Sequence, residues 1–184
     1  MKFLNSILTL LGAVVFYFVF YTLLKSVLPV LPDLNLFRQL DLTFVVKGYR
    51  VPAFDMIFFS FGLWVFCHGV LRLASLSEKD HSSKDDLDAG EFGKIRHPVY
   101  GAFMIIELGL FVSLRTVYSL CFMAVLIVFQ IVASYIEDNY VLKKKFGDSY
   151  DEYCNSVKRR FFTPVIIFYY LIAALLTFAG IYFM

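Results

Sequence analysis

Arg96 and His97 stand directly before Pro98 in the chain, and Tyr100 follows two residues later. Proline suits the first turn of an α-helix, because the N–H that it lacks would be unpaired there in any case. The order of these residues therefore predicts a helix that begins near Pro98, with Arg96 and His97 at its entrance. Free backbone N–H groups and the positive end of the helix dipole lie at such an entrance. This arrangement suits the binding of a carboxylate or a phosphate.

Two further groups of polar side chains interrupt the apolar stretches downstream of Pro98. At 100° per residue, each group falls on one face of a helix. The first face contains His97, Tyr100, Met104 and Glu107, and the second contains Gln130, Ser134 and Glu137. Charged groups inside apolar spans are costly and usually functional. We interpret the two faces as the lining of a cavity that opens toward the cytoplasm; the alternative is hydrogen bonding that joins the two helices.

A polar segment, 137–163, follows the second of these faces. It opens with Glu137 and Asp138 and continues through Tyr140 to the lysine run Lys143–Lys145. The two carboxylates are suited to bind a cationic group. The lysines are best explained by membrane topology and by attraction to lipid headgroups.

The same segment contains the signals of a helix boundary. Gly147 is expected to end one helix, and Asp148 is expected to cap the next. The residues that then share one helix face are Tyr150, Tyr153 and Val157. This spacing predicts a short amphipathic helix on the inner surface of a membrane.

These residues must be positioned by a very apolar chain. Of its 184 residues, 60% are hydrophobic and 17% are charged, whereas soluble domains are about 45–50% apolar and about 25% charged. A helix needs about 20 apolar residues to cross the hydrocarbon core of a bilayer. We therefore expect an all-α fold, a polytopic transmembrane bundle in which residues 1–184 form a single integral membrane domain. Five spans are expected, near 3–24, 53–71, 99–114, 116–136 and 164–184.

The charged residues predict how the bundle is oriented. Most of the Lys and Arg residues fall in the segments 72–98 and 137–163, and such residues are enriched on the cytoplasmic side. This places the N-terminus and both segments inside, the C-terminus outside, and an outer turn around Arg115. Segments of this length rarely fold alone. Any chemistry must therefore be built at the inner membrane surface, from these segments and the helix ends beneath them.

The segment 25–52 shows a different pattern, because apolar residues recur at even positions from Leu34 to Val46. Such alternation is typical of a strand, but no pairing partner is evident in the sequence. We interpret the segment as a lid or interfacial stretch on the outer leaflet rather than as a sheet.

Other site classes find little support in the sequence. The net charge is +2 and no basic stripe interleaves with aromatic residues, so no role with nucleic acid is expected. Cys67, Cys121 and Cys154 are isolated from one another, so neither a disulfide nor a metal site is expected. A Gly-x-Gly-x-x-Gly fingerprint is also missing, because Gly90 and Gly93 stand alone.

Together, the helix entrance and the polar segment resemble the isoprenylcysteine carboxyl methyltransferase and phospholipid N-methyltransferase superfamily of integral membrane enzymes. The matching residues are Gly90, Phe92, Arg96, His97, Pro98 and Tyr100, then Leu142, Phe146, Gly147, Tyr150, Tyr153, Arg160, Phe161 and Pro164. The resemblance covers residues 87–164. It departs from the family pattern where Asp138 and Asn139 replace a pair of glutamates, where Phe92 replaces a tyrosine, and where a final span follows Pro164.

The resemblance implies S-adenosylmethionine (SAM) as the methyl donor, held by short cytoplasmic helices that cap the core 87–164. The residues that it implies for cofactor binding are His97, Pro98, Tyr100, Glu137, Asp138 and Tyr140. Those that would act toward the substrate are Arg96, Glu107 and Arg160. No metal is implied. Methyl transfer depends mainly on positioning and on the exclusion of water, so it needs no nucleophile–base pair.

The resemblance also implies a lipophilic acceptor that enters from the bilayer, among membrane lipids. A carboxylate head, as in an isoprenylcysteine, would pair with Arg96 or Arg160, whereas an amine head would prefer Glu107. A thiol would need only a dry pocket. Two other readings of the motifs remain open: an NADPH-dependent membrane reductase and a non-enzymatic membrane accessory protein.

Overall fold

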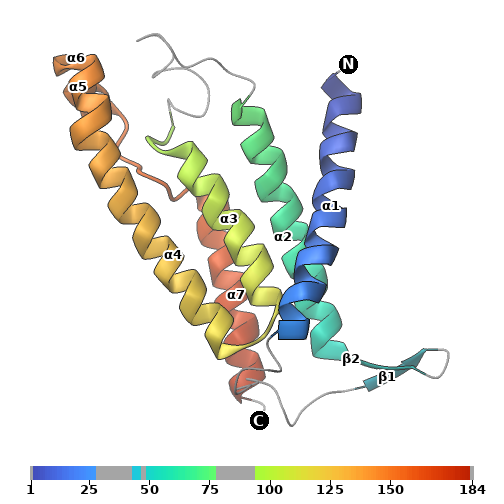
Figure 1. Ribbon diagram of the computed structural model, residues 1–184. Helices are drawn as coiled ribbons and strands as arrows, with labels where there is room; N and C mark the ends of the chain where they lie inside the picture. The colour runs from blue at the N-terminus through green and yellow to red at the C-terminus, as the bar shows by residue number, and fades with distance from the viewer. Residues whose placement is uncertain (1, 28–42, 47–48, 78–93, 183–184) are drawn as a thin grey trace.

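The computed structural model describes residues 2–27, 43–46, 49–77 and 94–182 (Figure 1). Within these ranges the regular structure is helical apart from one short β-hairpin, and short connections link the elements. The elements, in chain order, are α1 (Lys2–Val27), β1 (Thr43–Val46), β2 (Tyr49–Pro52), α2 (Ala53–Ser77), α3 (Pro98–Ser113), α4 (Val117–Ile136), the π-helix η3 (Glu137–Leu142), α5 (Lys143–Phe146), α6 (Asp148–Ser156) and α7 (Pro164–Tyr182). The N-terminal end of α1 lies at the same end of the bundle as α5 and α6, and the hairpin lies at the opposite end (Figure 1).

Three of the described helices are long and apolar enough to cross a membrane. They run over Asn5–Val27, Asp55–Leu76 and Val117–Phe146. Two shorter apolar helices cover Pro98–Ser113 and Pro164–Ala179. The helical bundle and its membrane character agree with the sequence-based prediction, whereas only three of the five expected spans meet the length and hydropathy of a crossing helix.

Helix α4 is polar on the inside and apolar on the outside. Its buried residues are Ser119, Gln130 and Ser134. Large apolar side chains such as Val125 and Phe129 are exposed on its outer face. A helix with this inverted pattern is stable where its surroundings are lipid and its partners are polar groups.

Helices α2 and α3 pack at very short range. A methyl group at Gly109 would lie 2.5 Å from the Phe66 nitrogen and 2.6 Å from the Gly62 oxygen, both of which are backbone atoms of α2. Small residues allow helices in membranes to approach this closely. Helix α1 joins the pair through Tyr17, whose hydroxyl donates to the Phe59 carbonyl oxygen at 3.2 Å.

The sharp turn between α3 and α4 agrees with the predicted hairpin. Arg115 adopts a φ of 56° in this turn, and its guanidinium lies 2.6 Å from the Asp55 carboxylate on α2. Thr116 caps α4 by accepting a hydrogen bond from the Ser119 backbone N–H at 3.1 Å. The ion pair fixes the turn against the first turn of α2.

The expectation that 25–52 contains no sheet was wrong for its last part. Strands β1 and β2 pair antiparallel, with Thr43 opposite Pro52 and Val46 opposite Tyr49. The partner of the alternating strand is therefore the segment that directly follows it, and β2 runs straight into α2. The alternating residues before Thr43 lie outside the described residues.

The polar segment after α4 continues the same helix. The helix passes through η3 and α5 without interruption and spans Val117–Phe146, so Glu137 and Asp138 are helical residues. Gly147 ends it with a φ of 58°, as predicted. Asp148 is the first residue of α6, and Gly147 occupies the capping position that was predicted for Asp148.

The predicted amphipathic helix corresponds to α6. Its apolar face is buried against the residues that precede Gly147. The side chains on this face are Tyr150, Tyr153 and Val157, and they pack on Leu142, Phe146 and Cys154. Helix α6 therefore folds back onto the end of the long α4–η3–α5 helix.

Candidate functional site

The entrance of α3 is joined to the connection between α6 and α7 by two backbone hydrogen bonds. The N–H of Arg96 donates to the Arg159 carbonyl oxygen and that of His97 to the Arg160 carbonyl oxygen, both at 2.9 Å. Helix α3 begins at Pro98, as the sequence predicts. The pairing brings Arg160 to the side of Arg96 and His97, although more than sixty residues separate them in the chain.

Asp138 lies at the centre of these charged groups and is 6% exposed. Its Oδ1 lies 2.6 Å from His97 Nε2 and accepts a hydrogen bond from the Tyr150 hydroxyl. Its Oδ2 lies 2.6 Å from Arg160 Nη2 and 3.9 Å from Arg96 Nη1. We call these five residues the Asp138 cluster; in it one carboxylate faces two guanidinium groups, an imidazole and a phenol.

The π-helix η3 positions the carboxylates of this site. Asp138 is the buried residue of η3, and π-helical turns recur at functional sites because they redirect side chains. The neighbouring Glu137 is only partly buried, and its Oε2 lies 3.5 Å from His97 Nδ1. Each ring nitrogen of His97 therefore faces a carboxylate oxygen. The ring of Tyr100 packs edge-on against that imidazole, with the ring centres 5.5 Å apart.

Tyr150 closes the cluster from α6. Burial, together with its hydrogen bond to the Asp138 carboxylate, raises the pKa of the Tyr150 phenol above its ordinary value. The phenol therefore stays protonated and acts as a hydrogen-bond donor at neutral pH. This donor compensates part of the cost of burying the Asp138 carboxylate.

Arg160 is held on three sides. Its guanidinium lies 3.6 Å from the centre of the Tyr135 ring, donates to the Ser134 hydroxyl at 3.4 Å, and pairs with Asp138. Stacking on an aromatic face and pairing with a carboxylate are the two modes of contact to which arginine is suited. Arg160 is thus oriented by two successive turns of the α4–η3 helix.

Glu107 forms a separate polar pair one level deeper in the bundle. Gln130 Nε2 on α4 donates a hydrogen bond to Glu107 Oε1. The ten residues from His97 to Glu107 correspond to about 15 Å along a helix. The two predicted polar faces of α3 and α4 meet at this point. They meet through a hydrogen bond between the helices, which was the alternative to the predicted cavity.

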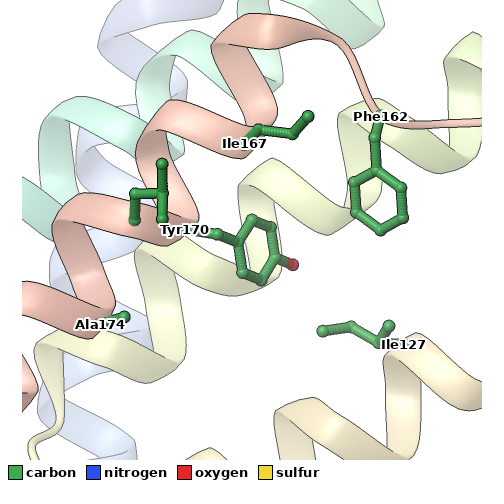
Figure 2. Close-up of a pocket in the computed structure, with 6 residues that line it drawn as sticks. Ile127, Phe162, Ile167, Tyr170 and Ala174 are labelled. Carbon is green, nitrogen blue, oxygen red and sulfur yellow. The ribbon is translucent and has the colours of Figure 1, made fainter.

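An apolar pocket of about 410 Å³ lies between α4 and the start of α7. Figure 2 shows Ile127 of α4 across the space from Phe162 and Tyr170, with the Tyr170 hydroxyl pointing between them. The remaining lining residues are Ile167, Leu171 and Ala174. The Tyr170 hydroxyl donates a hydrogen bond to the Met104 carbonyl oxygen of α3 at 3.3 Å. The pocket is therefore lined by α4, which contains Gln130, and by a tyrosine of α7 that is bonded to α3, the helix that contains Glu107.

The predicted site residues are only partly brought together. Arg96, His97, Asp138 and Arg160 meet in the Asp138 cluster, and Pro98, Tyr100 and Glu137 adjoin it. Glu107 lies apart with Gln130. Tyr140 is 73% exposed and takes no place in the cluster.

Two site residues were missed by reasoning from the sequence. Tyr150 was placed on the apolar face of a helix and among the residues that match the family pattern, but it was given no role in the site, and Tyr135 was not considered. A buried tyrosine normally requires a partner for its hydroxyl, so the predicted inward face and the motif match were the available signals for Tyr150. Nothing in the sequence singles out Tyr135.

The cluster is suited to bind a zwitterion, such as the amino-acid end of a larger molecule. Guanidinium groups bind carboxylates in paired geometry, and the two carboxylates at positions 137 and 138 suit an ammonium group.

Among the residues that the structure describes, no group of three or more His, Cys, Asp or Glu side chains is placed to hold a metal ion. Comparisons of the chain with protein-family models, with curated proteins and with solved structures found no match.

Proposed function

We propose that this protein is a SAM-dependent integral membrane methyltransferase that acts on a lipophilic acceptor. The observation that carries the proposal is the hydrogen bond between His97 and Asp138, at 2.6 Å and 41 residues apart in sequence. It joins the matched helix entrance to the polar segment 137–163, at the position where Asp138 stands in place of a glutamate of the family pattern. Arg160, in the last matched stretch, contacts the same carboxylate.

The residues present fit the amino-acid end of SAM. Arg96 Nε is buried and has no hydrogen-bond partner among the described residues, so it has a donor left for a carboxylate. Asp138 and Glu137 supply negative charge for an ammonium group, and Tyr100 supplies an aromatic face for a cation. When bound, SAM would supply an electrophilic methyl group for in-line displacement.

The remaining residues would position the reactants and exclude water. Asp138 holds His97 and Arg160 in fixed orientations, and the packing of α6 covers the cluster from one side. The apolar pocket beside Tyr170 suits a hydrocarbon chain that enters from the bilayer. An acceptor with a carboxylate head, as in an isoprenylcysteine, would meet Arg160, while an amine or a thiol is the alternative head group.

Five spans, with the N-terminus and the Asp138 cluster on the cytoplasmic side, belong to the same proposal. The start of α3, helices α5 and α6 and the N-terminal end of α1 lie at one end of the bundle (Figure 1). This end also holds the lysine run 143–145, as expected for a cytoplasmic surface. Helices α3 and α7 would supply the two spans beyond the three long ones.

We expect His97→Ala to weaken SAM binding by about tenfold or more, because it removes a buried group that contacts both carboxylates. The measurement is isothermal titration calorimetry on the purified protein in detergent. His68→Ala is the matched control, since His68 is bonded to Tyr169 at 2.6 Å on other helices. SAM binding by that variant should equal binding by the unmodified protein. Equal losses in both variants would contradict the assignment of His97.

Activity is tested by incubating the purified protein with methyl-labelled SAM and total membrane lipids. The expected result is label in a lipid-extractable product. Binding of NADPH without binding of SAM would favour a reductase and overturn the methyltransferase proposal. Absence of binding for both cofactors would favour a non-enzymatic accessory protein.

A further inference from the structure

The Glu107–Gln130 pair contains two buried oxygen atoms without partners. Gln130 is 8% exposed, and its amide nitrogen is used in the bond to Glu107 Oε1. Glu107 Oε2 and Gln130 Oε1 have no hydrogen-bond partner among the described residues. A buried acceptor left unpaired costs about 1–3 kcal/mol. The pair is therefore incomplete as the protein alone forms it.

The surroundings make this incompleteness more costly. Glu107 belongs to an apolar helix of the bundle, and a carboxylate within a membrane requires a proton or a cation to neutralise it. Arg160 is bound at Ser134, one turn from Gln130, but it is already paired with Asp138. The pair is therefore completed either by a proton or by a group from outside these residues, and the two cases are separated by the test below.

The two free oxygens define the chemistry of that group. Both are acceptors, so their partner must supply at least two N–H or O–H donors. A hydroxyl supplies one donor, whereas an ammonium supplies up to three and also a positive charge. A carboxylate or phosphate would instead face like charge at Glu107. Among lipophilic ligands with a single polar head group, a protonated amine therefore fits the pair best.

The lining of the apolar pocket comes within one helical turn of the pair, although neither Glu107 nor Gln130 lines it. Ile127 of its lining precedes Gln130 by one turn of α4, and Tyr170 of its lining bonds Met104, one turn before Glu107. A hydrocarbon chain in the pocket would therefore bring a group at its end toward Glu107 and Gln130.

The depth of the pair restricts the ligand further. Glu107 is nine residues beyond Pro98, about 13 Å along α3. A phospholipid keeps its phosphate and its amine at the membrane surface, so its headgroup does not fit this depth. An amine attached directly to an apolar chain does fit.

We propose that Glu107 and Gln130 form a subsite for the ammonium group of a lipophilic amine whose chain occupies the pocket lined by Ile127 and Tyr170. The subsite lies eight residues along the α4–η3 helix from Asp138. Binding there requires no SAM, so the proposal stands or falls separately from methyl transfer.

The test uses the full-length protein in neutral detergent, with decylamine, decanol and decanoic acid as probes. The measurement is the shift of the thermal unfolding midpoint as each probe is added, which reports ligand binding to the folded state. Decylamine is expected to raise the midpoint clearly more than decanol or decanoic acid does at the same concentration. Glu107→Gln is expected to weaken decylamine binding by about tenfold or more, because the charged partner is lost.

Two further variants make the result specific. Ala174→Phe fills the pocket without changing any charge and should also abolish the decylamine shift, while the same chemical change at the exposed Glu152, Glu152→Gln, should preserve it. An equal decylamine shift in the Glu107→Gln variant would overturn the proposal, because binding would then not depend on the Glu107 carboxylate. An equal shift with decanoic acid would overturn it as well.

Discussion

Asp138→Asn is expected to lower the free energy of unfolding by about 3–5 kcal/mol, the range for removing one partner of a buried ion pair. Asparagine keeps the shape of the side chain but removes its charge. The guanidinium of Arg160, now 2.6 Å from the carboxylate, would lose its counter-charge, and Arg96 would lose its more distant one. Tyr150 and His97 would lose a charged acceptor at the same time. The measurement is denaturation of the purified protein in detergent, followed by helical circular dichroism.

The chain offers a matched control for this substitution. Asp151 pairs with Lys143 at 3.1 Å, and both side chains are 54% exposed. Asp151→Asn should change stability by less than about 1 kcal/mol, because an exposed ion pair contributes little. Equal effects of the two substitutions would mean that Asp138 does not organise the fold.

The same pair of variants separates stability from cofactor binding. If the Asp138 cluster holds SAM as proposed, Asp138→Asn should lose binding at temperatures where the variant is still folded, whereas Asp151→Asn should retain it. A folded Asp138→Asn variant with unchanged SAM affinity would place the cofactor elsewhere.

The features that the sequence predicts well are those with a local cause. Pro98 fixes the start of α3 because of its missing N–H, and Gly147 ends α5 because it adopts a positive φ. The turn at Arg115 follows from two apolar stretches with one charged residue between them. Each of these signals depends only on residues close in sequence.

The helix boundaries that the sequence predicts wrongly are those where the local composition conflicts with the path of the chain. Polar residues after Ile136 read as a surface segment, yet the helix continues through them to Phe146. It does so because η3 turns Asp138 inward toward His97 and Tyr150, and that arrangement depends on contacts distant in sequence. The π-helical geometry itself has no sequence signature.

The composition of the site was similarly only half predictable. The motif identifies Arg96, His97 and Arg160 as site residues, but it does not predict that all three lie around one carboxylate. Glu107 falls on the same helix face as His97, and helical spacing alone therefore groups them. The rise along the helix separates Glu107 from His97. Glu107 pairs with Gln130 because of the position of α4, which the spacing along α3 does not predict.

The packing of α2 against α3 leads to the second large prediction, which concerns the frame that holds the site. Gly109→Ala is expected to destabilise the protein by about 1–3 kcal/mol, toward the upper end of the range for an overpacked core. The added methyl group would lie 2.5 Å from the Phe66 nitrogen and 2.6 Å from the Gly62 oxygen. These are backbone atoms, so no side-chain rotation relieves the overlap and the two helices must separate.

Gly12→Ala provides the matched control, because nothing lies within 4 Å of the position of its added methyl group. Alanine is the better helix former by about 1 kcal/mol, so this variant should be as stable as the unmodified protein or slightly more stable. If Gly109→Ala lowers the stability while Gly12→Ala leaves it equal or raises it, the close approach of α2 and α3, rather than helix propensity, determines the loss of stability at Gly109. Since α3 carries His97 at its entrance and Glu107 within it, separation of the helices should also weaken SAM and decylamine binding in the Gly109→Ala variant. Destabilisation by Gly12→Ala to the same extent as by Gly109→Ala would contradict this account of the packing.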